Sequence, residues 1–506
     1  MPPEREPEPL TSRTLTQRQA FISTTLAAAL AALVILTLLG HNRLTDWDEG
    51  IYAQVSREML QSGWLIPHWN TLVWIDKPPL TYWITALFFR LFGVSEFTAR
   101  LGSALSAITL VTVLHAWLLR ATNRLTTNRE TAPLTDDPQV PRPFRAGSHS
   151  SSRKGGFSPW GPPLPRTARP QLLTAWLSTF ILLSTFGFLH VARVGETDTL
   201  LSLGSFLALI GLANLLQPSE QPSTAPTHGW YLFWTGFAIA LMSKGAASGT
   251  LLFTLLALLL LDANLRRRAR AHFFYGFLLF LALTLPWHLY MLHRFGQVFV
   301  KQYLGLHVLG RVAYQFDGHL TPWWYYARVL LFSAPPWVLA YPVALYAAFR
   351  NPTLRPLRPF AVFAIVQILF FSCVQTRLPH YMAPAYAPLS ALVAIWLAAH
   401  LHTYLQSHPA ARPRTARLQL AAALTILWII TALLTAHLRS RLHSPRLPNG
   451  EVTPNNHEEV ALLKQVFRHP TPLVANTPGP LLDWRAGTYN PIPTDNFYSN
   501  RPVPQG

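Results

Sequence analysis

Long apolar runs recur along almost the whole chain and limit what it can fold into. A helix needs roughly 17 to 25 mostly apolar residues to cross a bilayer. Runs of this kind, some of them shorter, lie near residues 21–40, 97–120, 171–192, 199–216, 229–243, 247–262, 273–290, 326–348, 359–374, 382–400 and 418–437. The first is too long for a signal peptide and no small-residue cleavage site follows it, so we expect a retained anchor. The pattern predicts an all-α polytopic membrane protein with about eleven transmembrane helices.

The composition agrees with this class, because 50% of the 506 residues are hydrophobic and only 12% are charged. The net charge of +19 could indicate a nucleic-acid partner. The basic residues, however, form short clusters between the apolar runs instead of one face or tail, so we expect no nucleic-acid binding. The single cysteine, Cys373, can form no intrachain disulfide, and its apolar run predicts a small core side chain.

The arginine clusters predict the orientation of the helices, because Lys and Arg are retained on the cytoplasmic side. Clusters precede the first run and follow the sixth, eighth and tenth: Arg5, Arg13 and Arg18; Arg266, Arg267, Arg268 and Arg270; Arg350, Arg355 and Arg358; Arg412, Arg414 and Arg417. Residues 121–170, rich in Pro and Arg, fall on the same side and predict a disordered cytoplasmic insert. Arg439, Arg441 and Arg446 flank the last run on the opposite side and disagree with its orientation.

The same topology places the segment 41–96 outside the membrane. Its first motif, DWDEG, brings Asp46, Asp48 and Glu49 to the end of the first helix. The next stretch has apolar residues at four-residue spacing and predicts a helix along the membrane surface. The apolar segment KPPLTYWITALFFRLFG would invert all later loops if it crossed the membrane, so we expect a second surface-hugging or re-entrant helix. Residues 41–96 are therefore predicted to be a periplasmic loop with surface helices.

Three further polar clusters fall on this face. They are Glu196 and Asp198 after the third run; His307, Arg311, Asp317 and His319 before an aromatic cluster; and Arg377, His380 and Tyr381 after the ninth run. Ionisable groups are costly near lipid, so their shared location indicates a site.

Several motifs in matching order carry a resemblance that covers roughly residues 40–400: DEGIYAQVSREML, KPPLTYWITALFFRLFG, TARLGSAL, LMSKGA and FFSCVQTRLPHYMAPAYAPL. Together they resemble the bacterial aminoarabinose transferase and protein mannosyltransferase superfamily, multi-span glycosyltransferases of the GT-C type that use polyprenyl-phosphate sugars. The resemblance implies a GT-C-like catalytic domain over 21–437, between a cytoplasmic segment 1–20 and a polar, periplasmic tail 438–506. It also implies a site on the periplasmic face of the bacterial inner membrane, and a lipid, glycan or protein acceptor such as lipid A.

The resemblance also implies roles for individual residues. Asp48 and Glu49 match the acidic motif of the active-site loop, with Asp48 as the key carboxylate. The other matches are Lys77 in the K-P motif, Lys244 in the K-G motif, His307 in the large outer loop and Tyr381 in the last motif. The chain departs from the aminoarabinose transferases in having Arg377 for Lys, Asp76 for Glu, Ile51 for a basic residue, and a polar tail instead of extra C-terminal spans. The acceptor therefore stays open.

The residue types fit this chemistry. Asp48 can accept the proton of the attacking hydroxyl as a general base, with Asp198 as the next candidate. A cation can pair with the donor phosphate, and the candidates are Arg57, Lys77, Lys244 and Arg377, with Tyr381 beside them. A single displacement inverts the anomeric centre, and phosphate leaves without protonation, so one carboxylate suffices.

Other interpretations stay open at this point. Asp48 and Glu49 could only cap a helix, Lys77 could be an interface anchor, and Asp198 could pair with Arg193. Asp76 with His307 could bind a divalent metal ion. The alternative function is a transporter or flippase of lipid-linked sugars, which would need ionisable groups near the middle of the membrane and an internal repeat.

Overall fold

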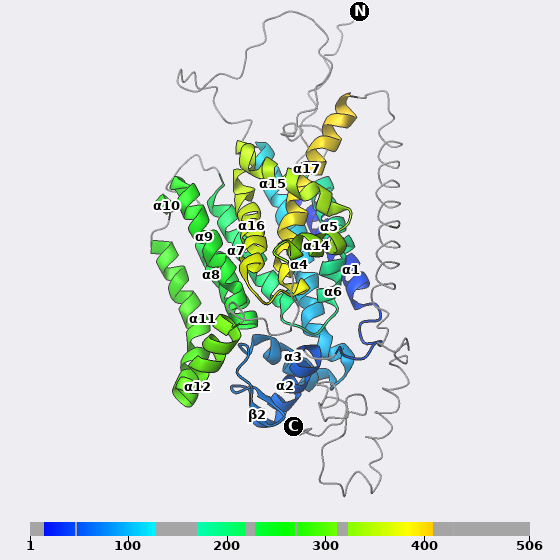
Figure 1. Cartoon of the computed structure of the whole chain (residues 1–506). Coiled ribbons are helices and arrows are strands. Elements are labelled where there is room, and N and C mark those ends of the chain that lie inside the picture. Colours follow the sequence, from blue (N-terminus) through cyan, green and yellow to red (C-terminus); the bar gives the residue numbers. More distant parts are fainter. Residues whose placement is uncertain are drawn as a thin grey trace, which may run out of the picture.

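The computed structural model describes residues 15–45, 48–127, 170–217, 228–268, 271–310 and 322–407, together with residue 429. Long helices stand side by side in a bundle, and a smaller cap lies at one end of it (Figure 1). The helices are α1 Gln17–Leu36, α2 Asp48–Ser62, α3 Leu80–Phe92, α4 Glu96–Thr127, α5 Pro170–Ser184, α6 Phe186–Ala192, α7 Asp198–Leu215, α8 His228–Lys244, α9 Thr250–Leu261, α10 Ala263–Arg268, α11 Ala271–Phe295, α12 Gln297–Phe299, η3 Val300–Gly310, α14 Tyr325–Ser333, α15 Tyr341–Arg350, α16 Arg358–Cys373 and α17 Ala383–Ser407.

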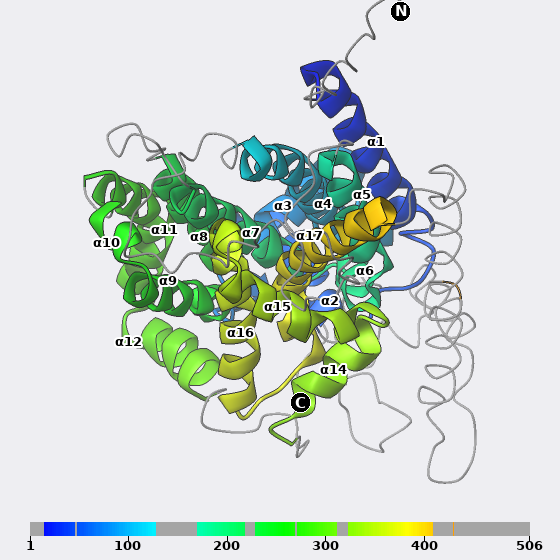
Figure 2. The ribbon, with the colours of Figure 1, turned by 90° about the horizontal axis from the view of Figure 1, so that it is seen from above.

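The predicted fold class is confirmed, and the chain is a multi-pass membrane protein. Seven of the described helical stretches are long and apolar enough to cross a membrane, or eight if the bent pair α5 and α6 is one span. In the most apolar part of α7 and of α17, 89% of the residues are buried, against 22% in α1. Figure 2 accordingly shows α7 and α17 in the middle of the bundle and α1 at its edge.

Helices α7 and α8 pack closely because glycines face each other along them. A Cβ atom on Gly204 would lie 2.6 Å from the carbonyl oxygen of Gly236, and one on Gly211 would lie 2.5 Å from that of Gly229. Small residues allow two membrane helices to approach at this distance. The antiparallel pairing brings the end of α8 to the start of α7.

The chain reverses direction between α8 and α9, as the separate runs 229–243 and 247–262 predicted. Gly245, in the η2 turn Gly245–Gly249, has a φ of +58°, a conformation that favours glycine. Lys244 lies beside Tyr381, which follows α16, whereas Asp262, after α9, bonds Arg355, which precedes α16. Helix α9 therefore runs back along α16.

The Asp262–Arg355 pair also bears on the predicted orientation. It joins the basic cluster of α10 to the cluster before α16, with Arg355 nitrogens 2.8 and 2.6 Å from the two carboxylate oxygens. Both clusters thus lie at the end of the bundle opposite to Asp198 and Lys244. This agrees with the prediction that the arginine clusters share one side.

Two predicted spans are interrupted. The run 171–192 is divided into α5 and α6, which meet at an angle of 72°. The run 326–348 is divided into α14 and α15, with Pro335 and Pro336 between them, because proline lacks the backbone N–H that would continue a helix. These interruptions, and short helices such as α9, are why fewer described spans than eleven reach full length. Cys373 is exposed, so its predicted place in the core is wrong.

The cap consists of α2, α3 and a two-stranded antiparallel hairpin, β1 His68–Trp69 and β2 Leu72–Val73. The predicted apolar face of α2, Ile51, Val55 and Met59, is buried, but it packs against Tyr82 and Ala86 of α3 instead of lying on the membrane. Helix α3 has 13 residues, too few to span a bilayer, as expected for KPPLTYWITALFFRLF.

Several predicted features lie outside the described residues. They are residues 1–14, most of the insert 121–170, the polar segment with Arg311, Asp317 and His319, the run 418–437 apart from residue 429, and the tail 438–506.

Candidate active site

The start of α7 and the end of α8 meet through an ion pair at the end of the bundle nearest the cap. Lys244 donates hydrogen bonds to both carboxylate oxygens of Asp198, with distances of 2.7 and 2.6 Å from Nζ. Both side chains are buried, and the ring centre of Tyr381 lies 5.4 Å from the same Nζ. Three predicted site residues from distant segments therefore lie together. Asp198 does not pair with Arg193, the alternative left open by the sequence. Arg193 instead donates to backbone carbonyls of α1.

A second buried lysine, Lys77, lies in the segment before α3. Its Nζ lies 2.9 Å from Asp76 Oδ2 and also donates to the hydroxyl group of Tyr52 on α2. The Tyr52 ring centre is 4.5 Å from the ammonium group. These contacts hold Lys77 inside the protein, which an interface anchor would not require.

Asp48 is the first residue of α2, and it lies within electrostatic reach of both lysines. Among the residues that the structure describes, no hydrogen bond or ion pair engages its carboxylate. Burial by itself raises its pKa, but the charges of Lys77, His380 and Lys244 outweigh burial, so the pKa falls below the usual value for an aspartate. Asp48 is therefore an ionised carboxylate with free lone pairs.

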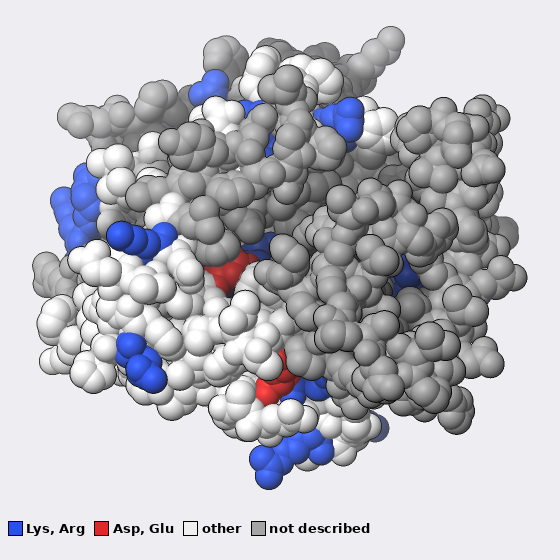
Figure 3. Space-filling model, turned by 60° about the horizontal axis from the view of Figure 1, so that its bottom comes forward, with Lys and Arg blue, Asp and Glu red and all other residues white. Residues whose placement is uncertain are grey.

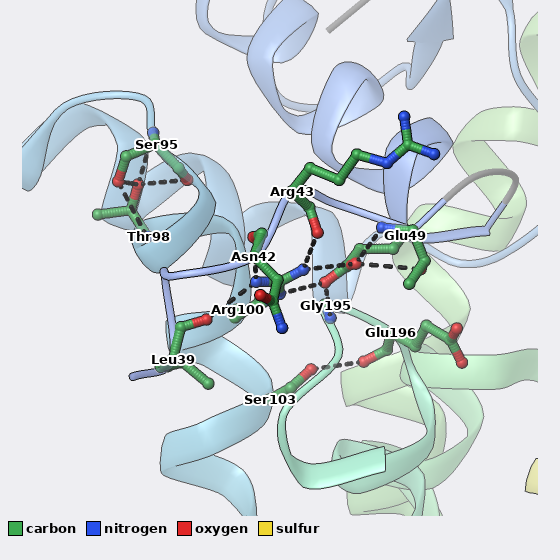
Figure 4. Close-up of polar contacts among 11 residues, drawn as sticks. Leu39, Asn42, Arg43, Glu49, Ser95, Thr98, Arg100, Ser103, Gly195 and Glu196 are labelled. Atoms are coloured by element: carbon green, nitrogen blue, oxygen red, sulfur yellow. Dashed lines mark hydrogen bonds and ion pairs between the residues drawn. The ribbon is translucent and has the colours of Figure 1, made fainter. Parts of the chain in front are cut away.

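The neighbouring acid, Glu49, has bonded partners and therefore a different role. It is fully buried, and it accepts hydrogen bonds from the Arg100 guanidinium group at 2.7 and 3.1 Å and from the backbone N–H of Gly195 at 2.7 Å. Arg100 in turn donates to three backbone carbonyls, those of Leu39, Asn42 and Arg43 (Figure 4). Glu49 thus ties α2 to α4 and to the segment before α7. A carboxylate so fully engaged is suited to positioning Asp48 and not to proton transfer.

The two predicted phosphate-binding arginines have contacts or positions that differ from those of the lysines. Arg377 donates to the backbone carbonyl of Ser372 at 2.8 and 3.2 Å and so caps the end of α16. Arg57 is half-buried on α2, nine positions after Asp48, which at about 100° per residue places it on the opposite side of the helix. Burial lowers the pKa of Arg57, and the charge of Glu58 opposes this shift.

The predicted metal site, Asp76 with His307, is not assembled in the described residues. Asp76 pairs with Lys77, and the side chain of His307, in η3, lies outside the description. Nor do the described residues hold any group of three or more His, Cys, Asp or Glu side chains placed to bind a metal ion. Metal binding stays a prediction.

Sequence reasoning gave no role to two residues that the structure places in or beside the site. Arg100 was visible in the motif TARLGSAL, where a lone arginine in an apolar helix needs a buried partner. Glu196 lies two positions before Asp198. Burial and the negative charges of Asp198 and Asp48 raise its pKa to about 8. It is therefore neutral at pH 7.

The site lies at the end of the molecule that Figure 3 brings forward, where small acidic areas show beside basic ones. An ionised carboxylate, a neutral carboxylic acid and two lysines lie together there. Such a set can bind an anionic group and take a proton from a hydroxyl group, since carboxyl groups with separated pKa values supply both protonation states.

Comparison with known proteins agrees with this arrangement. Residues 76–133, which contain Lys77, α3 and most of α4, match the family described as dolichyl-phosphate-mannose-protein mannosyltransferase. The undecaprenyl phosphate-alpha-4-amino-4-deoxy-L-arabinose arabinosyl transferase of Serratia proteamaculans is 27% identical over 376 residues, and that of Erwinia tasmaniensis is 27% identical over 368. The chain is similar to GT-C proteins of the aminoarabinose transferase type.

The match to these transferases covers 73% and 72% of this chain but spans only 58% and 57% of their own length. Among solved structures, ArnT from Cupriavidus metallidurans bound to undecaprenyl phosphate has a TM-score of 0.64 at 20% identity, covering 95% of this chain and 85% of that one. The Archaeoglobus fulgidus oligosaccharyltransferase in its apo form has a TM-score of 0.55 at 13% identity, covering 96% and 64%. These likenesses show that the chain has the fold of both.

Proposed function

We propose that the protein is an inverting glycosyltransferase, which moves a sugar from a polyprenyl-phosphate donor to a lipid, glycan or protein acceptor. The observation that carries this proposal is Asp48, an ionised carboxylate to which no described residue bonds a cation, within electrostatic reach of the buried cations Lys77 and Lys244. The names of the arabinosyl transferases and the undecaprenyl phosphate bound to ArnT support a donor of this class.

In this mechanism the two lysines hold the donor phosphate through charge-assisted hydrogen bonds. Tyr381 fixes the Lys244 ammonium group through its ring. Asp48 takes the proton of the acceptor hydroxyl group as its oxygen attacks the anomeric carbon. The bond from that carbon to the phosphate oxygen breaks, and its electron pair leaves with the phosphate, so the anomeric centre inverts.

We place the site on the periplasmic face of the bacterial inner membrane. Support comes from the Asp262–Arg355 pair, which brings two arginine clusters to the opposite end of the bundle, because such clusters mark the cytoplasmic side. The alternative, a flippase of lipid-linked sugars, is less favoured, because the acid–lysine pairs lie at one end of the helices and not midway along them.

The test uses purified protein with undecaprenyl-phosphate-linked 4-amino-4-deoxy-L-arabinose or mannose, and with lipid A, glycan and protein fractions as acceptors. A transferase releases undecaprenyl phosphate and adds the mass of the sugar to one fraction, and the Asp48→Asn variant does neither. In liposomes, movement of the intact donor across the bilayer without its consumption would support the flippase instead. The sugar that is consumed decides between pentosyl and hexosyl transfer.

A further inference from the structure

Among the described residues, five acidic side chains lie in or beside the site, and three of them are bonded to a cation. Glu49 pairs with Arg100, Asp76 with Lys77 and Asp198 with Lys244. The other two are Asp48 and Glu196, whose carboxylates have no bonded partner among the described residues. Figure 4 shows the Glu196 carboxylate pointing away from the Arg100 network, with no contact drawn to it. Two carboxyl groups of the site are therefore left without a bonded partner among the described residues, and the proposed mechanism uses only Asp48.

The backbone on both sides of Glu196 is fixed. The N–H group of Gly195 donates to Glu49, and the hydroxyl group of Ser103 on α4 donates to the carbonyl oxygen of Glu196 at 2.8 Å. A Cβ atom on Gly195 would lie 2.9 Å from the carbonyl oxygen of Ala99, so this segment lies directly against α4. The Glu196 side chain therefore starts from a defined place and is not part of a loose loop.

The charges around Glu196 limit its protonation state. The charged groups that act on it are Asp198 of α7, Asp48 and Glu49 of α2, and Lys244 of α8, and Glu196 in turn acts on Tyr52 of α2. Lys77 and Asp76, before α3, and His380, before α17, act on Asp48 and complete the charged groups of the site. Arg100 balances Glu49, and Arg193 is directed to α1. If Glu196 were ionised, it would add a second uncompensated negative charge to that of Asp48, because Asp76 and Asp198 already balance the two lysines. Such a site would repel a phosphate.

We propose that Glu196 binds the donor phosphate as a neutral carboxylic acid, donating its own proton in a hydrogen bond to a phosphate oxygen. This rests on the proposed function. No bond to Glu196 forms or breaks in the transfer: Asp48 receives the acceptor proton, and the phosphate leaves with the electron pair of its bond to the sugar. The hydrogen bond from Glu196 faces the negative charge that develops on that phosphate, where a preorganised donor is most effective. The raised pKa of Glu196, about 8, agrees with this neutral form.

The experiment measures binding of undecaprenyl phosphate to the purified full-length protein between about pH 6.5 and 9.5. In the wild type, affinity falls by roughly tenfold for each pH unit above the pKa of Glu196. Glu196→Gln keeps a neutral hydrogen-bond donor, so it binds within about threefold of the wild type at pH 7 and loses the alkaline fall. Glu196→Ala binds roughly 10- to 100-fold more weakly at pH 7 and also lacks the fall.

An alkaline fall that persists unchanged in Glu196→Gln would overturn the proposal, whether or not the variant is less stable. So would normal binding with lost turnover in this variant, because that pattern requires an ionised Glu196. Infrared difference spectroscopy of the wild type provides a measurement without any substitution. A neutral carboxyl band should be present at about pH 7 and shift when undecaprenyl phosphate is added. A wild-type protein that binds no undecaprenyl phosphate at any pH would instead contradict the proposed function itself.

Discussion

Lys244 at the end of α8 and Asp198 at the start of α7 form a doubly hydrogen-bonded ion pair, with Nζ 2.7 and 2.6 Å from the two carboxylate oxygens. Neither side chain is more than 8% exposed. The glycine-lined contact of the two helices sets the pair in place, so the same packing that stabilises the bundle positions Lys244 at the proposed phosphate site.

Removing one member of this pair leaves the other as a buried charge without an opposite charge beside it. We expect Asp198→Asn to lower the free energy of unfolding by about 3–5 kcal/mol. The double variant Asp198→Asn with Lys244→Met should regain most of that stability but not donor binding. Thermal unfolding in detergent and binding of undecaprenyl phosphate measure the two effects. Full binding by the stable double variant would exclude Lys244 from the phosphate site.

Asp48 and Glu49 should differ although they are adjacent. Asp48→Asn removes the general base while it keeps the shape, so turnover should fall roughly 100- to 10,000-fold while donor binding and stability are retained. Glu49→Gln leaves Arg100 without its buried partner, so it should lower the unfolding temperature. Sugar transfer and thermal unfolding of both variants test this. A folded Asp48→Asn protein with near-normal turnover would move the role of base to Asp198.

The different roles of Asp48 and Glu49 were only partly predictable from the sequence. DWDEG and the helix after it indicated an acidic motif at the start of α2. Which acid faces the site depends on the rotation of α2, and that is fixed by the contact of Glu49 with Arg100, 51 positions along the chain. The residues around DWDEG cannot predict a contact with a residue so far along the chain.

The membrane spans, too, were predicted in part from the sequence and in part not. Hydrophobic length predicted most helices and the reversal between α8 and α9. It missed the break between α14 and α15, because apolar residues continue on both sides of Pro335 and Pro336, and only the missing N–H groups end the helix. The meeting of Lys244 with Tyr381 was expected from the family resemblance, since residues 137 positions apart share no periodic signal.

Lys77 should bind the donor, whereas Arg57 should not. Lys77→Ala removes a buried cation beside Asp48, so the affinity for undecaprenyl phosphate should fall by at least tenfold, as expected for a lost charge-assisted contact. Arg57→Ala removes the same charge from the opposite side of α2 and is the matched control. Binding isotherms of the two variants decide this. An equal loss in both would show that Arg57 also belongs to the site.

Glu196 should make stability depend on pH. Its pKa is raised from an ordinary 4.5 to about 8, so between these values the folded protein keeps a proton that the unfolded chain releases. The contribution of Glu196 to stability is therefore full below about pH 4.5 and is lost as the pH rises through 8. Glu196→Gln should flatten the decline of the unfolding temperature over this range. Parallel curves for wild type and variant would contradict the assignment.

The orientation of the bundle can be tested with two cysteines placed at its opposite ends, in a Cys373→Ser background. Leu72, in the hairpin of the cap, and Thr353, between α15 and α16, are both exposed. The Asp262–Arg355 pair sets the end near Thr353 apart from the site, and arginine clusters mark the cytoplasmic side. An impermeant maleimide should therefore label Leu72→Cys in cells with a permeable outer membrane, and Thr353→Cys only after the inner membrane is disrupted. Ser150→Cys, in the insert 121–170, should behave like Thr353→Cys. The reverse labelling pattern would place the site on the cytoplasmic face. The proposal of a periplasmic site with periplasmic acceptors would then be wrong.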